Sequence, residues 1–126
     1  MEDVLLIQKI RGLFPDALNG IGGKGELEDG SHTATAFREL EEESGYKADD
    51  FSSFNHLSQL HFNETDITLH IYYGILKSND KEFKQKTDEV LAWYKVSEVL
   101  SMSADKLAGN GDVAKHIKAA RVHQNL

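Results

Sequence analysis

The sequence predicts an α/β protein, because it contains both strand-like and helix-like segments. Three apolar runs of strand length, residues 4–9, 54–62 and 67–76, are bounded by turn residues. An acidic stretch with helical spacing precedes a glycine, and an amphipathic stretch of helical period covers residues 112–122. Strands and helices that alternate in this way indicate a sheet packed against helices.

Length and composition indicate one ordinary globular domain. The chain has 126 residues, of which 40% are apolar and 28% charged, so it can bury a core of its own. We therefore expect a single domain over residues 1–126. The net charge of −7 argues against binding to a nucleic-acid polymer, which depends on a basic surface. It does not exclude a nucleotide.

The sequence also predicts the compartment. The absence of cysteine excludes a disulfide, a thiolate nucleophile and a zinc–sulfur site, and it fits a reducing compartment. Glu2 and Asp3 precede only a short apolar run, so we expect no signal peptide. No stretch approaches the roughly 20 apolar residues of a membrane span. We predict a cytoplasmic protein with no membrane partner.

The first third of the chain predicts a strand, a loop and a helix. Residues 4–9 are expected to form a buried strand, and residues 11–20, with the only proline, a loop. Ser31 or Thr33 is expected to cap a helix that runs to about residue 44. Gly45 is expected to end this helix, as a glycine in the left-handed conformation commonly does.

The middle of the chain predicts a hairpin whose strands are joined by residues 63–66. In the second strand, apolar residues alternate with polar ones, so one face is expected to belong to the core and the other to line a cleft. The core face would carry Ile67, Leu69, Ile71, Tyr73 and Ile75. Three histidines, His56, His61 and His70, are interpreted as polar positions on half-buried strands, since their spacing matches no metal site.

The last third predicts a polar loop over residues 77–87, an acid before a final strand, and a terminal helix. Trp93 is expected to be in the core. Residues 102–111 are expected to form a loop before the helix that starts at Asp112, where an acid complements the helix dipole.

The acidic helix and the glycines before it carry the chemistry. Glu39, Glu42 and Glu43 stand at positions i, i+3 and i+4, so they share one face of the helix. Crowded carboxylates suit a hard divalent cation such as Mg²⁺ or Mn²⁺. The glycines allow the backbone to approach a ligand. This pattern indicates phosphate chemistry assisted by a metal ion.

Residues 22–46 resemble the Nudix box of the MutT-like pyrophosphohydrolases. The match consists of a box glycine, an Arg-Glu-apolar-x-Glu-Glu-x-Gly run and a final apolar residue, here Gly23, Arg38 to Leu40, Glu42, Glu43, Gly45 and Tyr46. The family's first Glu falls on Asp29, and one extra residue stands between Asp29 and Arg38. In the family this acid braces the loop through the Arg.

The resemblance implies the Nudix α/β/α sandwich with a mixed sheet, whose usual first strand is missing or short here. A partner chain covering the exposed sheet edge is a further hypothesis, which makes a homodimer a candidate. The resemblance also implies hydrolysis of a nucleoside diphosphate linked to another group, by water attacking phosphorus.

Metal ligands follow from the resemblance. Glu42 and Glu43 would be the principal ligands, with the Gly22 carbonyl and Glu89 completing the shell; Asp88 is the alternative to Glu89. Glu39 would be either a ligand or the general base. Arg38 is expected to pair with an acid of the loop.

Residues 19–24, Asn-Gly-Ile-Gly-Gly-Lys, are similar to the corresponding segment of oxidised-purine nucleoside triphosphatases in the family, where the Asn reaches the base. Asn19 is therefore a base-binding candidate, with a plain Asn-Gly turn as an equal alternative. Gly23 and Lys24 are candidates for phosphate, and Asn110 and Asp112 for the base. For Asp112 we favour the cap.

The leading substrate is a nucleoside triphosphate, with an oxidised purine such as 8-oxo-dGTP as the specific candidate. Sugar nucleotides, dinucleotides and ADP-ribose come next. ADP-ribose enzymes of the family often carry a proline some distance after the box, and here Pro15 is the only proline. A Nudix fold retained as a non-catalytic nucleotide-binding module is the alternative from another class.

Overall fold

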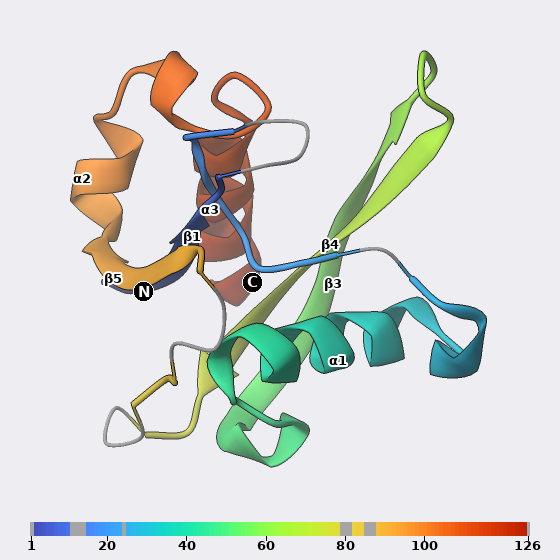
Figure 1. Ribbon diagram of the computed structural model, residues 1–126. Helices are drawn as coiled ribbons and strands as arrows, with labels where there is room; N and C mark the ends of the chain where they lie inside the picture. Colours follow the sequence, from blue (N-terminus) through green and yellow to red (C-terminus); the bar gives the residue numbers. More distant parts are fainter. Residues whose placement is uncertain (1, 11–14, 24, 79–81, 85–87, 126) are drawn as a thin grey trace. The chain divides into compact units, whose positions relative to one another are not determined.

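The computed structural model describes residues 2–10, 15–23, 25–78, 82–84 and 88–125 (Figure 1). The chain divides into two compact units. Unit 1 consists of Met1–Ile21 and Gln85–Leu126, and unit 2 consists of Gly22–Lys84. The single domain over residues 1–126 stays a prediction.

Within the described residues, the sheet of unit 1 has three antiparallel strands in the order β2-β1-β5. These strands are β1 (Asp3–Gln8), β2 (Leu18–Asn19) and β5 (Val90–Lys95). The strand predicted over residues 4–9 is confirmed as β1, and it lies in the middle of this sheet with a partner on both sides. The predicted loop over residues 11–20 is wrong at β2, because the backbone there pairs with Ile7 and Gln8 of β1.

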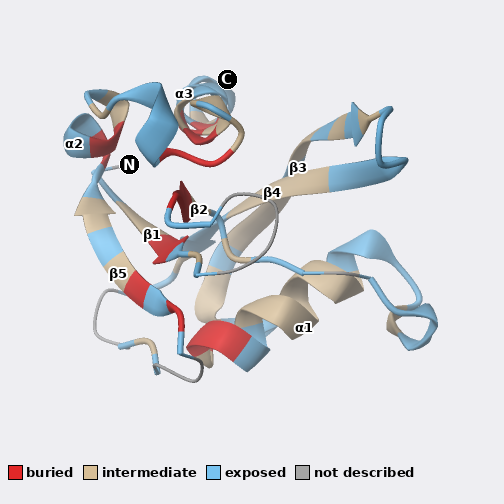
Figure 2. Ribbon diagram, turned by 45° about the horizontal axis from the view of Figure 1, so that its top comes forward, coloured by how far each residue is buried: buried red, intermediate tan, exposed pale blue. Residues whose placement is uncertain are grey.

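The core of unit 1 lies on one face of this sheet. Leu6 of β1 packs with residues of α2 (Val96–Leu100) and α3 (Asp112–Gln124), among them the buried Val99 and Ile117. In Figure 2 the buried residues of unit 1 concentrate on the strands and on the helix sides that face them. The predicted terminal helix is confirmed, whereas α2 and the short 3-10 helix η3 (Ala104–Lys106) were not predicted.

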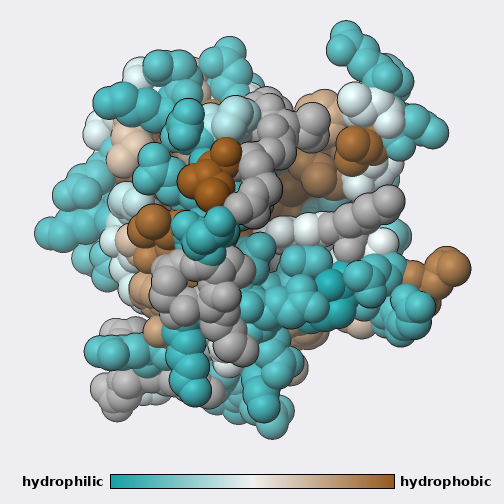
Figure 3. Space-filling model, in the orientation of Figure 1, coloured by the Kyte–Doolittle hydropathy of each residue, from teal (hydrophilic) through white to brown (hydrophobic). Residues whose placement is uncertain are grey.

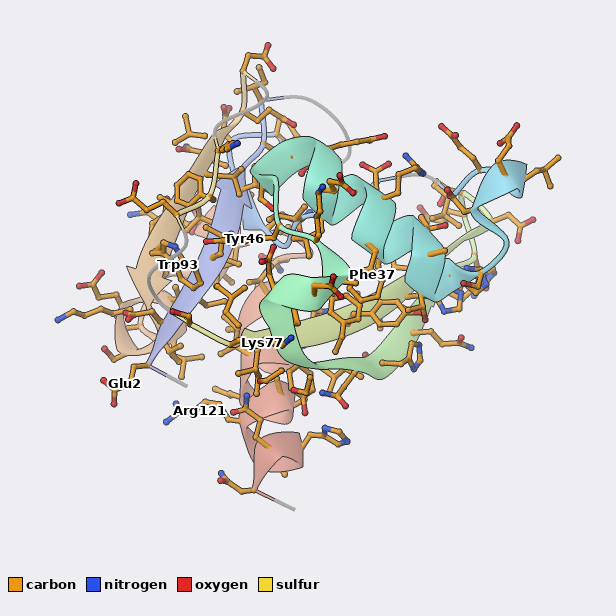
Figure 4. All side chains as sticks on the ribbon, turned by 90° about the horizontal axis from the view of Figure 1, so that it is seen from below. Glu2, Phe37, Tyr46, Lys77, Trp93 and Arg121 are labelled. Atoms are coloured by element: carbon orange, nitrogen blue, oxygen red, sulfur yellow. The ribbon has the colours of Figure 1, made fainter. Side chains whose placement is uncertain are left out.

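Trp93 is not a core residue, contrary to the prediction. It lies opposite Leu5 in the register of β1 and β5, whereas the core cluster contains the neighbouring Leu6. Because successive side chains of a strand point to opposite faces, Trp93 points away from that cluster. Its exposed fraction is 45% (labelled in Figure 4).

Unit 2 begins with the predicted acidic helix, α1 (His32–Ser44). Ser31 is the N-cap: its Oγ accepts a hydrogen bond from the Ala34 backbone N–H at 3.1 Å. Gly45 ends the helix with φ 80°, and its N–H donates to the Glu41 carbonyl. Both predicted ends are therefore confirmed, with Ser31 and not Thr33 as the cap.

The rest of unit 2 is a long antiparallel hairpin of β3 (Phe51–Phe62) and β4 (Ile67–Leu76). β4 has the predicted bounds, and β3 starts a few residues earlier than predicted. Two 3-10 turns, η1 (Leu27–Asp29) and η2 (Ala48–Asp50), precede α1 and β3 respectively.

Aromatic rings join α1 to the hairpin. The Phe37 ring centroid lies 4.2 Å from that of Phe54, and the ring points from α1 toward the strands (Figure 4). The Thr33 hydroxyl lies 3.2 Å from the Tyr72 hydroxyl, and the His32 ring stacks on His70 at 3.7 Å. The helix therefore covers the face of β4 that carries His70 and Tyr72.

The prediction of which face of β4 is covered is wrong. The polar face, expected to line a cleft, is the one that packs against α1. On the face expected to form the core, Ile67, Leu69 and Ile75 are 38%, 39% and 36% exposed. The reason is that α1 offers His32, which stacks on His70 of β4, and Phe37, which packs against Phe54 of the neighbouring strand β3.

No helix among the described residues is both long enough and apolar enough to cross a membrane.

Candidate active site

The carboxylates and the arginine predicted for the site lie on α1. Arg38, Glu39 and Glu42 are adjacent on the helix surface, and Thr35 lies one turn earlier on the same side. Figure 3 shows mainly hydrophilic residues along the visible side of α1. The helix therefore presents a polar, largely acidic surface with one arginine in it.

Arg38 joins the loop to the helix. Its Nε and Nη2 donate to Asp29 Oδ1 and Oδ2 at 2.7 and 3.0 Å, while its Nη1 donates to Glu39 Oε1 at 2.9 Å and to Glu42 Oε1 at 3.3 Å. The pairing predicted between Arg38 and an acid of the loop is confirmed, and Asp29 is that acid.

Asp29 is held as a carboxylate. The Arg38 guanidinium holds its pKa well below the usual range, helped by the Glu26 backbone N–H and the Thr35 hydroxyl. In turn, the Asp29 carboxylate raises the pKa of Arg38 above its ordinary value. The pair therefore stays charged throughout the physiological pH range.

The three glutamates are not equivalent in the structure. The Glu39 side chain is 13% exposed, the Glu42 side chain is 56% exposed, and Glu43 is buried at the last turn of α1 (Figure 2). Within the described parts of the chain, no three His, Cys, Asp or Glu side chains gather closely enough to hold a metal ion. Arg38 contacts both Glu39 and Glu42 and balances their charge.

The donor set nevertheless suits a divalent cation. Glu39, Glu42 and Glu43 supply hard carboxylate oxygens from adjacent turns of one helix, as such a cation prefers. The loop backbone also comes close: a Cβ placed on Gly23 would overlap the Glu39 carboxylate. Because Glu42 is half exposed, it can turn away from Arg38 when a cation enters.

The glycine loop is described in part. Gly22 and Gly23 are exposed, and a Cβ on Gly22 would meet nothing within 4 Å. Of these two glycines, Gly23 therefore has a steric need for glycine and Gly22 does not. Lys24, a predicted phosphate contact, lies outside the described residues.

Glu89, the predicted metal ligand downstream, is a buried member of unit 1. Its Oε1 accepts a hydrogen bond from Lys9 Nζ at 2.9 Å, and its Oε2 accepts one from the Ile10 backbone N–H at 2.7 Å. These contacts tie the segment before β5 to the end of β1. Asp88, its alternative, is exposed. The metal-binding role of Glu89 stays a prediction.

The structure brings the segments of Asn19 and Asn110 together in unit 1. Leu18 forms a parallel bridge with Leu107, and the Ala108 backbone N–H donates to the Leu18 carbonyl at 2.8 Å. Asn110 has φ 53°, between two glycines with φ of 70° and 100°. Glycine adopts a positive φ without strain, so Asn110 is the residue in this run whose backbone conformation is unusual.

Both alternatives for Asn19 persist. Its Oδ1 accepts a hydrogen bond from the Gly20 backbone N–H at 2.8 Å, as in a turn, yet the residue is only half buried.

Asp112 is the first residue of α3, after the N-cap Gly111, and its carboxylate lies against Gly109. The favoured prediction that Asp112 caps the helix is wrong, because Gly111 is the N-cap and no side chain makes a cap hydrogen bond. As an acid in the first turn, Asp112 still complements the helix dipole.

Two features of unit 2 were missed by the sequence analysis. Thr35 donates a hydrogen bond to Asp29, and its position one turn before Arg38 was the available signal. His32 stacks on His70, with the His56 ring centroid 5.7 Å from that of His70. The third predicted polar histidine, His61, bonds to Thr68 through Nδ1 at 2.8 Å.

Solved structures share this fold. A MutT structure from work on the Aliivibrio salmonicida and Vibrio cholerae proteins matches with a TM-score of 0.70 and 17% identity, covering 94% of this chain and 87% of that one. The NUDIX domain of Shewanella oneidensis NrtR, complexed with ADP ribose, matches with a TM-score of 0.67 and 21% identity, covering 97% and 77%.

A MutT/nudix family protein from Enterococcus faecalis matches with a TM-score of 0.73 and 17% identity, covering 97% of this chain and 55% of that one. These likenesses confirm the predicted Nudix fold. No curated protein matches the chain significantly.

The NUDIX domain family model matches residues 1–117. The chain therefore belongs to the Nudix family, as the resemblance in the box implied. It is a Nudix hydrolase, of a family that acts on nucleoside diphosphate-linked substrates and uses divalent metal ions.

Proposed function

We propose that this hydrolase converts a nucleoside triphosphate, with an oxidised purine as the leading base, into the monophosphate and pyrophosphate. The observation that carries the proposal is the bridge between Leu18 and Leu107, which brings the segments of Asn19 and Asn110 together. Two amide side chains on adjoining segments supply both donors and acceptors, which suits the edge of a purine base.

Metal-assisted attack of water is the chemistry proposed for the helix. A divalent cation bound here would screen the charge of the pyrophosphate and lower the pKa of the attacking water. Glu42 and Glu43 would hold it, with the Gly22 carbonyl and Glu89 as further ligands. Mg²⁺ or Mn²⁺ is the proposed ion.

Glu39 would take the proton of the attacking water or join the ligands. Its side chain is only 13% exposed and accepts a hydrogen bond from Arg38, so its carboxylate is held in place. Arg38 would orient Glu39, and Gly23 and Lys24 would contact the phosphates. Asp112 would contribute through the start of α3, beside Asn110.

ADP-ribose is the second candidate substrate. The structural likeness to the NUDIX domain of NrtR, solved with ADP ribose, favours it at 21% identity. The same likeness is consistent with the alternative function, a protein that binds a nucleotide without hydrolysing it. In either case the partner is a small nucleotide, and a homodimer and a cytoplasmic location remain predictions.

A hydrolysis screen tests the proposal. The purified protein would be given Mg²⁺ or Mn²⁺ and ordinary and oxidised nucleoside triphosphates, ADP-ribose, dinucleoside polyphosphates and sugar nucleotides. Release of pyrophosphate and monophosphate from one triphosphate is the expected result. Preferential cleavage of ADP-ribose would replace the first candidate by the second, and binding without turnover would favour a non-catalytic module.

Glu42→Gln is the matched control for this screen. The amide keeps the size of the side chain but removes its charge, so we expect the rate to fall by several orders of magnitude. Because Glu42 is half exposed, the thermal unfolding curve should change little. Full activity in this variant would refute the role assigned to Glu42.

A further inference from the structure

The turn before α1 departs from the family pattern in two linked ways. The acid is Asp29, one methylene shorter than Glu, and the chain before Arg38 is one residue longer. The structure folds this segment into the 3-10 turn η1, which closes with a hydrogen bond from the Asp29 N–H to the Glu26 carbonyl at 3.0 Å. Gly30 follows with φ 80° and leads into the helix cap.

Asp29 is the centre of a hydrogen-bond network. Four donors reach its two carboxylate oxygens: Arg38 Nε, Arg38 Nη2, the Glu26 backbone N–H at 2.9 Å and the Thr35 hydroxyl at 2.7 Å. With so many donors already on its oxygens, this carboxylate is not available as a metal ligand. Its contacts instead fix where Arg38 lies.

The Thr35 hydroxyl is a second donor from α1, one turn before Arg38. It has one proton, and its oxygen lies 2.7 Å from Asp29 Oδ2 and 3.2 Å from the Ser31 carbonyl, so the shorter contact is the better hydrogen bond. A Cβ on Gly25 would lie 3.3 Å from the Thr35 hydroxyl, so the glycine leaves room for the loop to pass it.

We propose that Thr35 is a positioning residue for the hydrolytic site, and that the extra residue in η1 lets the shorter Asp29 reach Arg38. The network directs Arg38 Nη1 to Glu39 and Glu42, so it sets the orientation of the carboxylates assigned to the chemistry. This inference rests on the proposed function for its catalytic consequence but not for its structural part.

The first test compares Thr35→Val with Thr35→Ser. Valine keeps the shape and removes the hydroxyl, whereas serine keeps the hydroxyl. Loss of a side chain that orients metal ligands typically costs about 10- to 100-fold in metal affinity or activity. Thr35→Val should therefore weaken Mn²⁺ binding and lower kcat, each at least tenfold. Thr35→Ser should keep both the Mn²⁺ affinity and kcat within about threefold of the wild-type values. Mn²⁺ affinity is read by electron paramagnetic resonance.

A third readout separates this inference from the proposed function. The Arg38 Nε–H group, protected by Asp29, should exchange slowly with water in a nitrogen-15 NMR spectrum, and Thr35→Val should accelerate that exchange. If wild type hydrolyses nothing in the screen yet Thr35→Val changes the exchange, the proposed function fails and the positioning network stands. Unchanged exchange and unchanged Mn²⁺ affinity would overturn the inference, as would equal damage by serine and valine.

The second test uses the loop length. Leu27 is 99% exposed, so deleting it removes no packing. Asp29→Glu and the Leu27 deletion should each weaken Mn²⁺ binding by about tenfold or more, since each misplaces Arg38. Together they should restore most of the affinity. If the loss of Mn²⁺ affinity in the combined variant equals the product of the two single losses, the identity of the acid and the length of the loop act independently.

Discussion

At the scale of single residues, Asp29 holds Arg38 with both of its carboxylate oxygens. The motif predicted that an acid of the loop pairs with Arg38, and the structure places Asp29 there. The contribution of Thr35 was missed: its place one turn before Arg38 puts it on the same side of the helix, but the path of the η1 turn decides that its hydroxyl reaches Asp29. The same limit applies to Glu89, whose bonds to Lys9 and Ile10 join distant parts of the chain.

Gly23 provides a prediction at this scale. Gly23→Ala should lower kcat by on the order of 100-fold, because the added Cβ would displace the Glu39 carboxylate, and shifts of about 1 Å can cost that much. Steady-state kinetics measures the effect. Gly20→Ala is the control, since its Cβ meets nothing within 4 Å and Gly20 has no assigned role. Equal rates in both variants would contradict the assigned contact.

At the scale of elements, local signals predicted α1 and the hairpin well. Ser31 and Gly45 mark the helix ends through short-range hydrogen bonds, which the sequence encodes directly. The face of β4 that packs against α1 was predicted wrongly, since strand alternation identifies two faces but not the one a helix will cover. The short strand β2 and helix α2 depend on pairing and packing with remote segments, so local patterns did not reveal them.

Ser31→Ala should destabilise the protein by about 1 kcal/mol, the usual cost of losing an N-cap hydrogen bond. Urea denaturation at neutral pH measures the free energy of unfolding. Ser31→Asp should retain most of the stability, because an aspartate also caps a helix well. Equal stability of the alanine variant and wild type would mean that the Ala34 N–H gains nothing from the cap.

The histidines between α1 and the hairpin predict a pH dependence. Burial lowers the pKa of His70, and the nearby His32 of α1 and His56 of β3 lower it further. The unfolded chain therefore binds a proton more readily than the native protein. The stabilising contribution is complete above the unfolded value of about 6.5 and is lost as the pH falls toward the lower native value.

This dependence is measured by urea denaturation between about pH 7.5 and 5, across the unfolded pKa of histidine. His70→Phe keeps an aromatic ring against His32 but cannot take up a proton, so the stability of this variant should depend less steeply on pH. A slope identical to wild type would assign the effect to other groups.

At the scale of the whole molecule, the family and its fold were predictable because the box residues and the strand and helix pattern agree over most of the chain. The family model covers residues 1–117. The exact base is less predictable, since Asn19 and Asn110 lie far apart in the sequence and only the bridge between Leu18 and Leu107 brings their segments together.

The net charge of −7 leads to a prediction for the whole molecule. Long duplex DNA should not be retained at about 0.15 M salt, where binding depends on neutralised phosphates. A gel-shift titration checks this, with the nucleotide from the hydrolysis screen as the positive control for binding. A shift of duplex DNA at this salt concentration would contradict the prediction.

The division of the chain has a consequence for biosynthesis. Unit 2 is one continuous segment, whereas unit 1 joins both ends of the chain, and its first strand β1 pairs with β5. A chain leaving the ribosome exposes its amino-terminal end first, and domains generally fold as they emerge. The acidic helix and the hairpin can thus form before β5 is available to pair with β1. Completion of unit 1 therefore requires that β5 has been synthesised.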